Sequence, residues 1–512
     1  MAGIVQFFAR ESDEGHRCGY CKGATSCYSK GMWAYVLTPQ NYQDLIDRGW
    51  RRSGKYCYKP TMNKTCCPQY TIRCDALAFK LKKSHKKLLK RIHRFLMHGG
   101  RQEAVGSEPE ASGGGLEATA SDSHSTEVVS AGNSEADDYA TGDTDCRAMD
   151  ESDLSGRGVG RINDDDNDFL SSGRDITDSR VPDTSLIDSS GENKTSPVIP
   201  TDRHKTGDVT PMIERGPCLK KKELRKQRWA QKRKAANLPL EPQPTPKNHE
   251  KTLEEWLALP EGKHKLEIRL IRTTPYSAEA QESEDASHHV YTLYQMKVHS
   301  CTKDKCKQNE WKQFLIDSPL TPVSNPLLGS FHQQYWLDGR LIAVCVLDLL
   351  PSCVSSVYLY YDPEFSFLSL GTFSTLCEIQ LVRDLHKKLP SLKYYYMGFY
   401  IHSCPKMIYK AKLPNSDILC PETYTWHPIS HCLPLIAANK YSRLEPNPEI
   451  EDARRPTSIK QASILLNRRG MTVAQYLQRK KVDGEELEEI REYCELVGST
   501  VMKEVYLFRD GD

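Results

Sequence analysis

A long acidic segment constrains this chain more than any other feature, because it separates two parts that can each bury a core. Residues 101–215 contain 26 Asp and Glu against 10 Lys and Arg, and they are rich in Ser, Gly and Thr. Their scattered apolar residues follow neither a helical nor a strand period. This composition predicts disorder, so the folded parts must come from the sequence on either side.

Four parts follow from this division. We expect a Cys-rich N-terminal domain at 1–98, a disordered acidic linker at 99–217, a basic helix or linker at 218–250 and a second folded domain at 251–512. The whole chain carries a net charge of +2, so the residues outside the acidic segment carry +18. A basic folded part suits a polyanionic partner such as nucleic acid, although excess lysine is also common on solvated surfaces.

The N-terminus has no basic start followed by a long apolar run, and the longest apolar segment, 341–354, is interrupted by Asp348 and Pro351. We therefore expect neither a signal peptide nor a membrane span. In a chain that is not exported, the 18 cysteines should be reduced thiols. Clustered cysteines are then candidate metal ligands rather than disulfide partners.

Two basic elements flank the acidic segment. The first is an amphipathic helix predicted at 77–98, whose apolar side includes Leu77, Leu81 and Leu88 and whose other face is basic. The second is a predicted helical run at 219–237. Both are candidates for binding RNA phosphates, through residues Lys82, Lys83, Lys86, Lys87, Lys90, Arg91, Lys221, Arg225 and Arg228. The first could equally be a solvated face, and the second a nuclear-import signal.

The second folded domain contains an antiparallel pattern followed by a helix. We expect strands at 334–336, 341–349 and 356–361, with an Asp338-Gly339 hairpin turn between the first two. Apolar residues spaced by three or four predict a helix at 372–389, and the run 394–401 predicts a returning strand. The fold class is therefore α+β, with a mixed sheet covered by helices.

Several strings in this sequence resemble one enzyme family. At the N-terminus these are Cys18-Gly19-Tyr20-Cys21, Gly31-Met32-Trp33 and Cys66-Cys67-Pro68. In the C-terminal domain they lie within 330–344, 358–372 and 395–407, including Tyr358-Leu359-Tyr360-Tyr361-Asp362-Pro363. Over about 1–98 and 252–440, the chain resembles the eukaryotic arginyl-tRNA–protein transferases.

The resemblance implies both a fold and an activity. The family's catalytic domain is similar to the GNAT acetyltransferase fold, and it takes an aminoacyl-tRNA in place of acetyl-CoA. The family transfers arginine to the N-terminal α-amine of proteins that begin with Asp, Glu or oxidised Cys, which marks them for ubiquitin-dependent degradation. Acetyltransferases of this fold wrap CoA with a glycine-rich loop, whereas 367–373 holds only Gly371. CoA is therefore disfavoured, and Gly371 and Thr372 at a helix start become candidates for a phosphate or the terminal ribose.

Arginine transfer from tRNA requires little from the enzyme beyond positioning. An aminoacyl-tRNA is an activated ester, so attack by an amine is downhill and needs no ATP. An α-amine has a pKa of about 7.7 to 8.0, so a weak base is sufficient. Glu378 and Asp338 are candidate bases, while Gln333 and Tyr335 could donate hydrogen bonds to the ester or ribose. Asp338 could instead be a turn former, Glu378 a solvent-facing residue and Tyr335 an ordinary strand aromatic.

An acidic acceptor residue requires cationic or N–H donors. His402 and Lys406 follow the returning strand in a loop, with Tyr395 inside that strand, and we expect these residues to bind the substrate. Lys410 and Lys412 follow in the same loop. Each of these cations could also be a plain surface charge.

The N-terminal cysteines form the second constellation. Cys18 and Cys21 make a Cys-x-x-Cys pair, and Cys66 with Cys67 offers two further sulfurs. Four thiolates suit either an iron–sulfur cluster or Zn²⁺. Adjacent cysteines are unusual in a zinc knuckle, and the family resemblance implies iron–sulfur, so we expect a cluster with zinc as the alternative. Buried free thiols are the remaining possibility.

Two other function classes stay open at this point. The chain could be a GNAT acetyltransferase that uses acetyl-CoA, or a non-enzymatic RNA-binding adaptor with a metal-stabilised module. The family implies a cytoplasmic and nuclear enzyme, and we expect a monomer that binds Arg-tRNA and acidic N-termini and no membrane.

Overall fold

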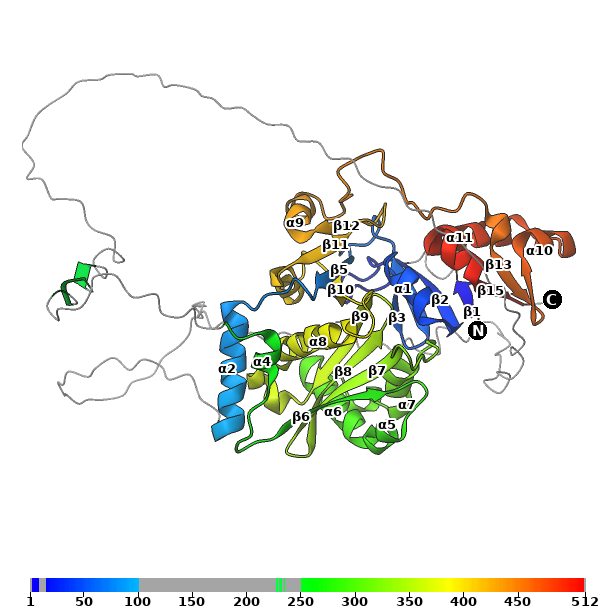
Figure 1. Cartoon of the computed structure of the whole chain (residues 1–512). Coiled ribbons are helices and arrows are strands. Elements are labelled where there is room, and N and C mark those ends of the chain that lie inside the picture. Colours follow the sequence, from blue (N-terminus) through cyan, green and yellow to red (C-terminus); the bar gives the residue numbers. More distant parts are fainter. Residues whose placement is uncertain are drawn as a thin grey trace, which may run out of the picture. The chain divides into compact units, whose positions relative to one another are not determined.

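The computed structural model describes residues 2–8, 15–100 and 250–510, together with helical positions at 227–228, 230–232 and 234. The chain divides into two compact units, Met1–Ile162 with Lys251–Asp512, and Asn163–Glu250. Every helix and strand named below belongs to the first unit (Figure 1). The predicted acidic linker lies outside the described residues.

The larger of two sheets has eight strands and carries the expected mixed topology. In spatial order its strands are β12 (Trp426–Pro428), β11 (Ser416–Leu419), β5 (Tyr70–Asp75), β10 (Tyr394–Tyr400), β9 (Cys353–Tyr361), β8 (Arg340–Leu349), β7 (Gly329–Leu337) and β6 (Leu266–Arg272). All neighbours are antiparallel except β9 and β10. The predicted α+β class is confirmed.

Helices cover both faces of this sheet, because side chains alternate along each strand. On one face, Gln334 donates to Ser283 at the start of α6 (Glu284–Val298), and the Tyr360 hydroxyl bonds Ser287. On the other face, the Tyr335 ring packs against Phe373 of α8 (Leu370–His386). The predicted hairpin, crossing helix and returning strand are confirmed as β7–β8, α8 and β10.

The parallel strands β9 and β10 separate after a short contact. They pair only at Cys353–Ser355 with Tyr394–Tyr396. Beyond these positions β9 follows β8, while β10 follows β5 across a register shift between Tyr396 and Phe399. Gly398 lies in this shift with φ +70°, a conformation that favours glycine. A cleft opens where the two strands diverge.

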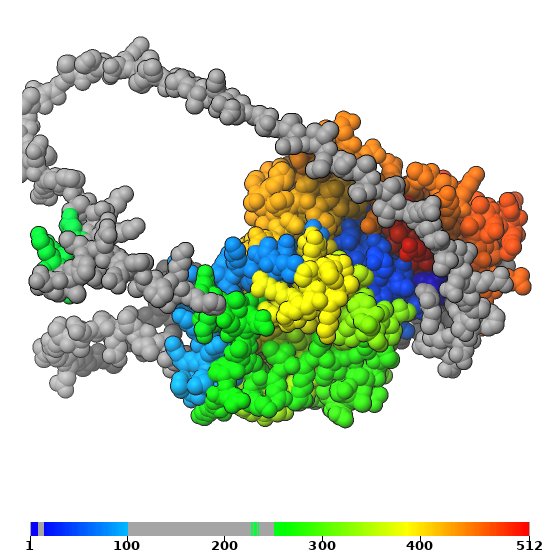
Figure 2. Space-filling view, in the orientation of Figure 1, coloured from blue at the N-terminus to red at the C-terminus, as the bar shows by residue number. Residues whose placement is uncertain are grey.

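The N-terminal and C-terminal parts of the chain are interleaved. The N-terminal strand β5 is inserted between β10 and β11 of the larger sheet. In Figure 2, blue N-terminal residues meet both the green-to-yellow and the orange-to-red parts of the chain. Folding of the C-terminal domain therefore requires a strand from the first hundred residues.

The smaller, seven-stranded sheet combines both ends of the described chain. In spatial order its strands are β14 (Arg469–Thr472), β13 (Ser463–Leu466), β15 (Val505–Arg509), β1 (Gly3–Phe8), β2 (Ser29–Val36), β4 (Tyr56–Pro60) and β3 (Arg51–Ser53). Helix α1 (Pro39–Ile46) and helix α11 (Gly484–Glu504) pack with it around a second apolar core. The C-terminal segment, for which the sequence indicates a helix and a final apolar run, thus completes the N-terminal sheet.

The basic helix α2 (Lys83–His98) begins later than predicted. The Asp75 carboxylate accepts from the amides of Leu77 and Ala78, which forms a turn where the pattern predicted helix. Leu77 is therefore exposed, and Leu89 and Leu96 join the buried face. The remaining helices are short or peripheral: α4 (Leu253–Leu257), α5 (Ala278–Glu282), η4 (Lys303–Lys305), α7 (Gln308–Trp311), η5 (Lys312–Ile316), η6 (Pro363–Leu368), η7 (Pro405–Lys412), α9 (Ile429–Ala438), η8 (Ile459–Gln461) and α10 (Val473–Arg479).

Among the described residues, none of the helices has the length and apolar character that crossing a bilayer requires.

Candidate functional site

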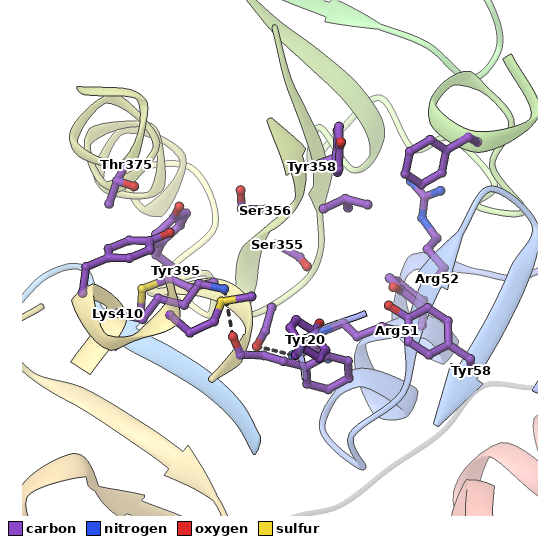
Figure 3. A pocket seen from close by; sticks show the side chains of 18 residues that line it. Tyr20, Arg51, Arg52, Tyr58, Ser355, Ser356, Tyr358, Thr375, Tyr395 and Lys410 are labelled. Carbon is purple, nitrogen blue, oxygen red and sulfur yellow. Dashed lines mark hydrogen bonds between the residues drawn. The ribbon is translucent and has the colours of Figure 1, made fainter. Parts of the chain in front are cut away.

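The cleft between β9 and β10 draws its walls from three distant parts of the chain. Its lining residues are mostly aromatic, hydroxylic or cationic, and they are Tyr20, Tyr42, Arg51, Arg52, Tyr58, Phe314, Ser355, Ser356, Val357, Tyr358, Thr375, Tyr395, Met397, Gly398, Phe399, Met407, Tyr409 and Lys410. In Figure 3, Thr375 and Tyr395 lie on one side and Arg51 and Tyr58 on the other, with Ser355 of β9 between them. The cleft can therefore hold a ligand that touches chemically different walls.

A buried carboxyl group lies behind one wall of the cleft. Glu378 is 1% exposed on α8, and its Oε2 has no hydrogen-bond partner. Burial raises the pKa of Glu378 to about 7, and hydrogen bonds from Tyr395 and Ser356 partly oppose this rise. A carboxyl group with a pKa near neutrality can both accept and release a proton at cellular pH.

Tyr395 connects that carboxyl group with the cleft. Its hydroxyl interacts with Glu378 and with Thr375, and both Tyr395 and Thr375 line the cleft. Burial and the nearby carboxylate raise the pKa of Tyr395 well above its ordinary value. The phenol therefore keeps its proton and can relay protons between a ligand and Glu378.

The opposite wall of the cleft is cationic. Arg51 and Arg52 line it, whereas Lys410 lies beside Tyr395 (Figure 3). None of the described residues that line the cleft is Asp or Glu. Arg52 has its own partner outside the lining, because it makes a two-point ion pair with Asp348 at 2.7 and 2.8 Å. The positive charge of this wall favours an anionic group on the ligand.

The other three predicted catalytic residues lie apart from the lining of the cleft. Asp338 is in the β7–β8 turn, where it bonds His264 and the amide of Lys265 at 2.6 and 2.7 Å. Tyr335 donates to Gln333 at 2.8 Å, and both side chains are buried in β7. These contacts favour the turn-forming role for Asp338 and a packing role for the strand pair.

The predicted acceptor-binding residues are divided between the cleft and the surface. Tyr395 lines the cleft, whereas His402 and Lys406 are exposed. The His402 ring bonds the Tyr400 hydroxyl at 2.9 Å. Lys410, further along the same loop, is 3% exposed and lines the cleft.

The start of helix α8 carries the predicted Gly371 and Thr372. Ser369 precedes the helix in a left-handed conformation, and its carbonyl accepts from the Thr372 amide at 3.1 Å. Arg91 of α2 donates to the Ser369 hydroxyl at 2.7 Å. The basic helix therefore lies against the helix start to which the sequence analysis assigned a phosphate or ribose.

Helix α2 presents most of its predicted cations to solvent. Lys82, Lys83, Lys87, Lys90 and Arg91 are exposed, and Lys86 is half-buried. In the second unit, Arg228 is exposed at a helical position, while Lys221 and Arg225 lie outside the described residues.

The four predicted cysteine ligands come together. The sulfurs of Cys18, Cys21, Cys66 and Cys67 all lie within 4.8 Å of one another. The Cys21 and Cys66 sulfurs are 3.3 Å apart, and a backbone hydrogen bond at Gly23 lowers the pKa of Cys21 to about 6. Four convergent thiol groups fit one metal site. Cys57, Cys74 and His85, which also lie in the N-terminal part of the chain, do not belong to the group.

The cysteine group is joined directly to the cleft. Tyr20, which lies between Cys18 and Cys21, is one of the residues lining the cleft. Met407, which also lines it, packs on the buried cysteines together with Ile401. A metal at the four sulfurs would therefore fix part of the cleft wall.

Comparisons with known proteins agree with this arrangement. Residues 286–420 match the family model "Arginine-tRNA-protein transferase, C terminus", and residues 16–87 match the corresponding N terminus. The chain is 39% identical to the Drosophila melanogaster protein "Arginyl-tRNA--protein transferase 1", over 97% of each chain. It belongs to the arginyl-tRNA–protein transferase family.

Two more distant similarities complete the comparison. A Campylobacter jejuni "Aspartate/glutamate leucyltransferase" is 36% identical over 89 residues, which cover 17% of this chain and 35% of that protein. A solved tandem GNAT protein from clavulanic acid biosynthesis is 15% identical, with a TM-score of 0.19, over 30% of this chain and 41% of the other.

The cleft-lining residues that sequence reasoning missed include Arg51, Arg52, Tyr20 and the hydroxyl residues of β9. Their spacing in the sequence carries no signal, because the cleft joins segments more than 300 positions apart. Only the position of Tyr20 inside the Cys-x-x-Cys pair could have suggested a place beside a site.

Proposed function

We propose that this family member transfers arginine from Arg-tRNA to the N-terminal α-amine of proteins that begin with Asp, Glu or oxidised Cys. The observation that carries the proposal is the cleft at the β9–β10 divergence, which has a proton-accepting wall and a cationic wall. Arginylation of these acceptors would mark them for ubiquitin-dependent degradation in the cytoplasm and nucleus, with the enzyme acting as a monomer.

The reaction forms one amide bond and breaks one ester bond. The neutral α-amine attacks the carbonyl carbon of the arginyl ester, and the bond to the 3′-terminal ribose oxygen then breaks. The attacking nitrogen loses a proton, and the ribose oxygen gains one as it leaves. Holding the two reactants in one cleft supplies most of the acceleration, because the ester is already activated.

Tyr395 and Glu378 are suited to remove the proton from the amine. The Tyr395 hydroxyl would accept that proton while passing its own to Glu378, which lies behind it. Glu378 thus acts through Tyr395 rather than by direct contact. The proton on Glu378 can then return along the same path to the ribose oxygen.

The tRNA acceptor stem would lie along helix α2. Its exposed cations suit the phosphates of an A-form stem, and Arg91 brings this helix to the start of α8 beside the cleft. Gly371 and Thr372 are then near the terminal nucleotide. Arg228 in the second unit would supply a further phosphate contact, together with the predicted Lys221 and Arg225.

The acidic character of the acceptor has independent support. The cationic wall contains no carboxylate that would neutralise it within the cleft. The partial relative from Campylobacter jejuni is named for aspartate and glutamate. His402 and Lys406 are exposed on the segment that carries Met407 and Lys410 to the cleft, and they would attract an acidic peptide rather than hold its first side chain.

A metal at the four cysteines would have a structural part in this function. Zn²⁺ with sulfur ligands at about 2.3 Å would fit the compact spacing, because its four sulfurs lie roughly 4 Å apart. An iron–sulfur cluster, which the family resemblance implies, interposes several atoms between its ligands and would need a wider opening. Anaerobic purification followed by zinc, iron and sulfide analysis distinguishes the two.

A direct assay tests the transfer itself. The protein is mixed with radiolabelled Arg-tRNA and a peptide beginning with Asp, and in parallel with radiolabelled acetyl-CoA. Label should enter the peptide only from Arg-tRNA. Label from acetyl-CoA would instead support an acetyltransferase, and tRNA binding without transfer would support an RNA-binding adaptor.

A further inference from the structure

We propose that Arg51 receives the anionic side chain of the acceptor's first residue. This assignment rests on the proposed function and names the residue that determines its specificity. The evidence is the position of a buried cation that has no carboxylate partner in a cleft where the reaction would occur.

Within the described part of the chain, the Arg51 guanidinium group is bonded only to backbone carbonyls. Arg51 is 7% exposed, and it donates to the carbonyls of Trp50 at 2.6 Å, Ile46 at 3.4 Å and Gly398 at 3.2 Å. Its Nε has no partner, and its charge lies 5.0 Å from the centre of the Phe399 ring. A buried cation normally has an anionic partner, so this side chain lacks the group that would compensate its charge.

The neighbouring arginine provides an internal comparison. Arg52 is equally buried and lines the same cleft, but Asp348 pairs with it at 2.7 Å. Asp348 in turn accepts from Ser330 at 2.7 Å. Among the described residues, a carboxylate is therefore supplied to the arginine that is structural, and none is supplied to Arg51.

The irregularity in β10 holds one buried cation on each side of the cleft. Gly398, at φ +70°, presents its carbonyl to Arg51, and the next carbonyl, that of Phe399, accepts from Lys410 at 2.8 Å. Two buried cations, from β3 and η7, thus bind consecutive carbonyls of one strand from the two sides of the cleft (Figure 3). Lys410 lies on the side of Tyr395, and Arg51 lies on the opposite wall.

This arrangement accounts for recognition of the first residue in particular. The α-amine and the side-chain carboxylate of Asp or Glu belong to one residue, so the two groups can contact opposite walls of a single cleft. Tyr395 lies on the reacting wall and Arg51 on the cationic wall (Figure 3). A cysteine sulfinate carries its charge at a similar distance from the amine and would bind in the same way.

The test compares two acceptor peptides in the full-length enzyme. Peptides beginning with Asp or Asn differ only in charge, and the ratio of their kcat/KM values measures recognition of the anion. We expect Arg51→Gln to raise KM for the Asp peptide on the order of 100-fold and to bring the ratio close to one. The affinity for Arg-tRNA should remain unchanged. In the control Arg469→Gln, at an exposed position on β14, KM for the Asp peptide and the ratio of the two kcat/KM values should also remain unchanged.

The outcomes separate this inference from the proposed function. An enzyme that transfers no arginine to the Asp peptide contradicts the proposed function itself. If the native enzyme is active and Arg51→Gln keeps both its KM and its preference for Asp, the assignment of Arg51 is wrong. If Arg51→Gln does not fold, Arg51→Lys replaces it in the test. One ammonium group cannot bind both the Gly398 carbonyl and an acid, so we expect KM for the Asp peptide to rise at least tenfold. An unchanged KM overturns the assignment.

Discussion

Replacement of Glu378 by glutamine should stabilise the protein at alkaline pH while it removes activity. The Glu378 carboxyl group has an ordinary pKa of 4.5, and burial raises it to about 7 in the fold. The unfolded chain therefore releases this proton at lower pH than the native chain does. The carboxyl group destabilises the fold progressively as the pH rises from 4.5 to about 7, and the effect is complete above that range.

The size of the effect follows from the two pKa values. One pKa unit corresponds to about 1.4 kcal/mol. Ionised Glu378 thus lowers the free energy of unfolding on the order of 3 kcal/mol at pH 8, whereas at pH 5 the group is protonated and costs little. Because glutamine has no charge to bury, Glu378→Gln should match the native stability at pH 5 and exceed it by roughly 3 kcal/mol at pH 8.

Urea unfolding of both proteins at pH 5 and pH 8 measures this difference. Glu267→Gln is the matched control, because hydrogen bonds from Lys265 and Arg269 lower the pKa of half-buried Glu267 to about 2. That substitution should change stability in the opposite direction. In single-turnover assays, Glu378→Gln should lower the transfer rate on the order of 10²- to 10⁴-fold. A stability difference that is the same at both pH values would refute the assigned environment of Glu378.

Three further predictions concern the groups around the cleft. Asp348→Asn should lower the free energy of unfolding by about 3 to 5 kcal/mol in a urea titration, because it leaves Arg52 buried and unpaired. Removal of metal by a chelator should release Tyr20 and raise KM for an acidic peptide, as steady-state assays would detect, while Arg-tRNA affinity measured by filter binding is retained. Reversing the charges of Lys87 and Lys90 should weaken tRNA binding and reduce the slope of log affinity against log salt by roughly one to two, whereas reversing exposed Lys481 should change neither value.

Local patterns predicted the centre of the larger sheet well. The Asp338-Gly339 turn fixes a hairpin because both residues adopt positive φ, and the helix pattern that follows has apolar residues at one spacing throughout. The start of α2 was predicted wrongly, because hydrogen bonds of the Asp75 side chain compete with helix formation over the next residues. The periodicity of apolar residues indicates which face of a helix is buried. It does not indicate where side-chain hydrogen bonds compete with helix formation.

The pairing of strands that are distant in the chain could not be predicted from the sequence. The sequence of strand β5 does not identify the two strands that pair with it, β10 and β11, which follow more than 300 residues later. The same applies to β1 and β15, which join the two ends of the described chain as parallel neighbours. Strand pairing of this kind depends on tertiary packing, and one sequence contains no measure of it.

The candidate site shows the same division between local and distant information. The cysteine ligands could be predicted because the two cysteines of each pair are already close in the sequence. A four-sulfur site then needs only that the two pairs lie together, and their sulfurs are within 4.8 Å of one another. Arg51 could not be found, since Arg51-Arg52 reads as two surface charges. What distinguishes the two residues is that Asp348 pairs with one of them and no carboxylate pairs with the other.

The interleaving of the chain would explain why the proposed reaction and recognition share one cleft. The proposed reacting wall comes from α8, β10 and η7, the cationic wall comes from β3, and Tyr20 joins the cleft to the cysteine group. Because β5 is part of the larger sheet, the N-terminal residues cannot separate from the reacting wall without breaking two strand ladders. The two walls of the cleft are therefore held at a fixed separation, which would match the distance between the amine and the acid of one acceptor residue. An acceptor whose charge lies in its second residue should be excluded.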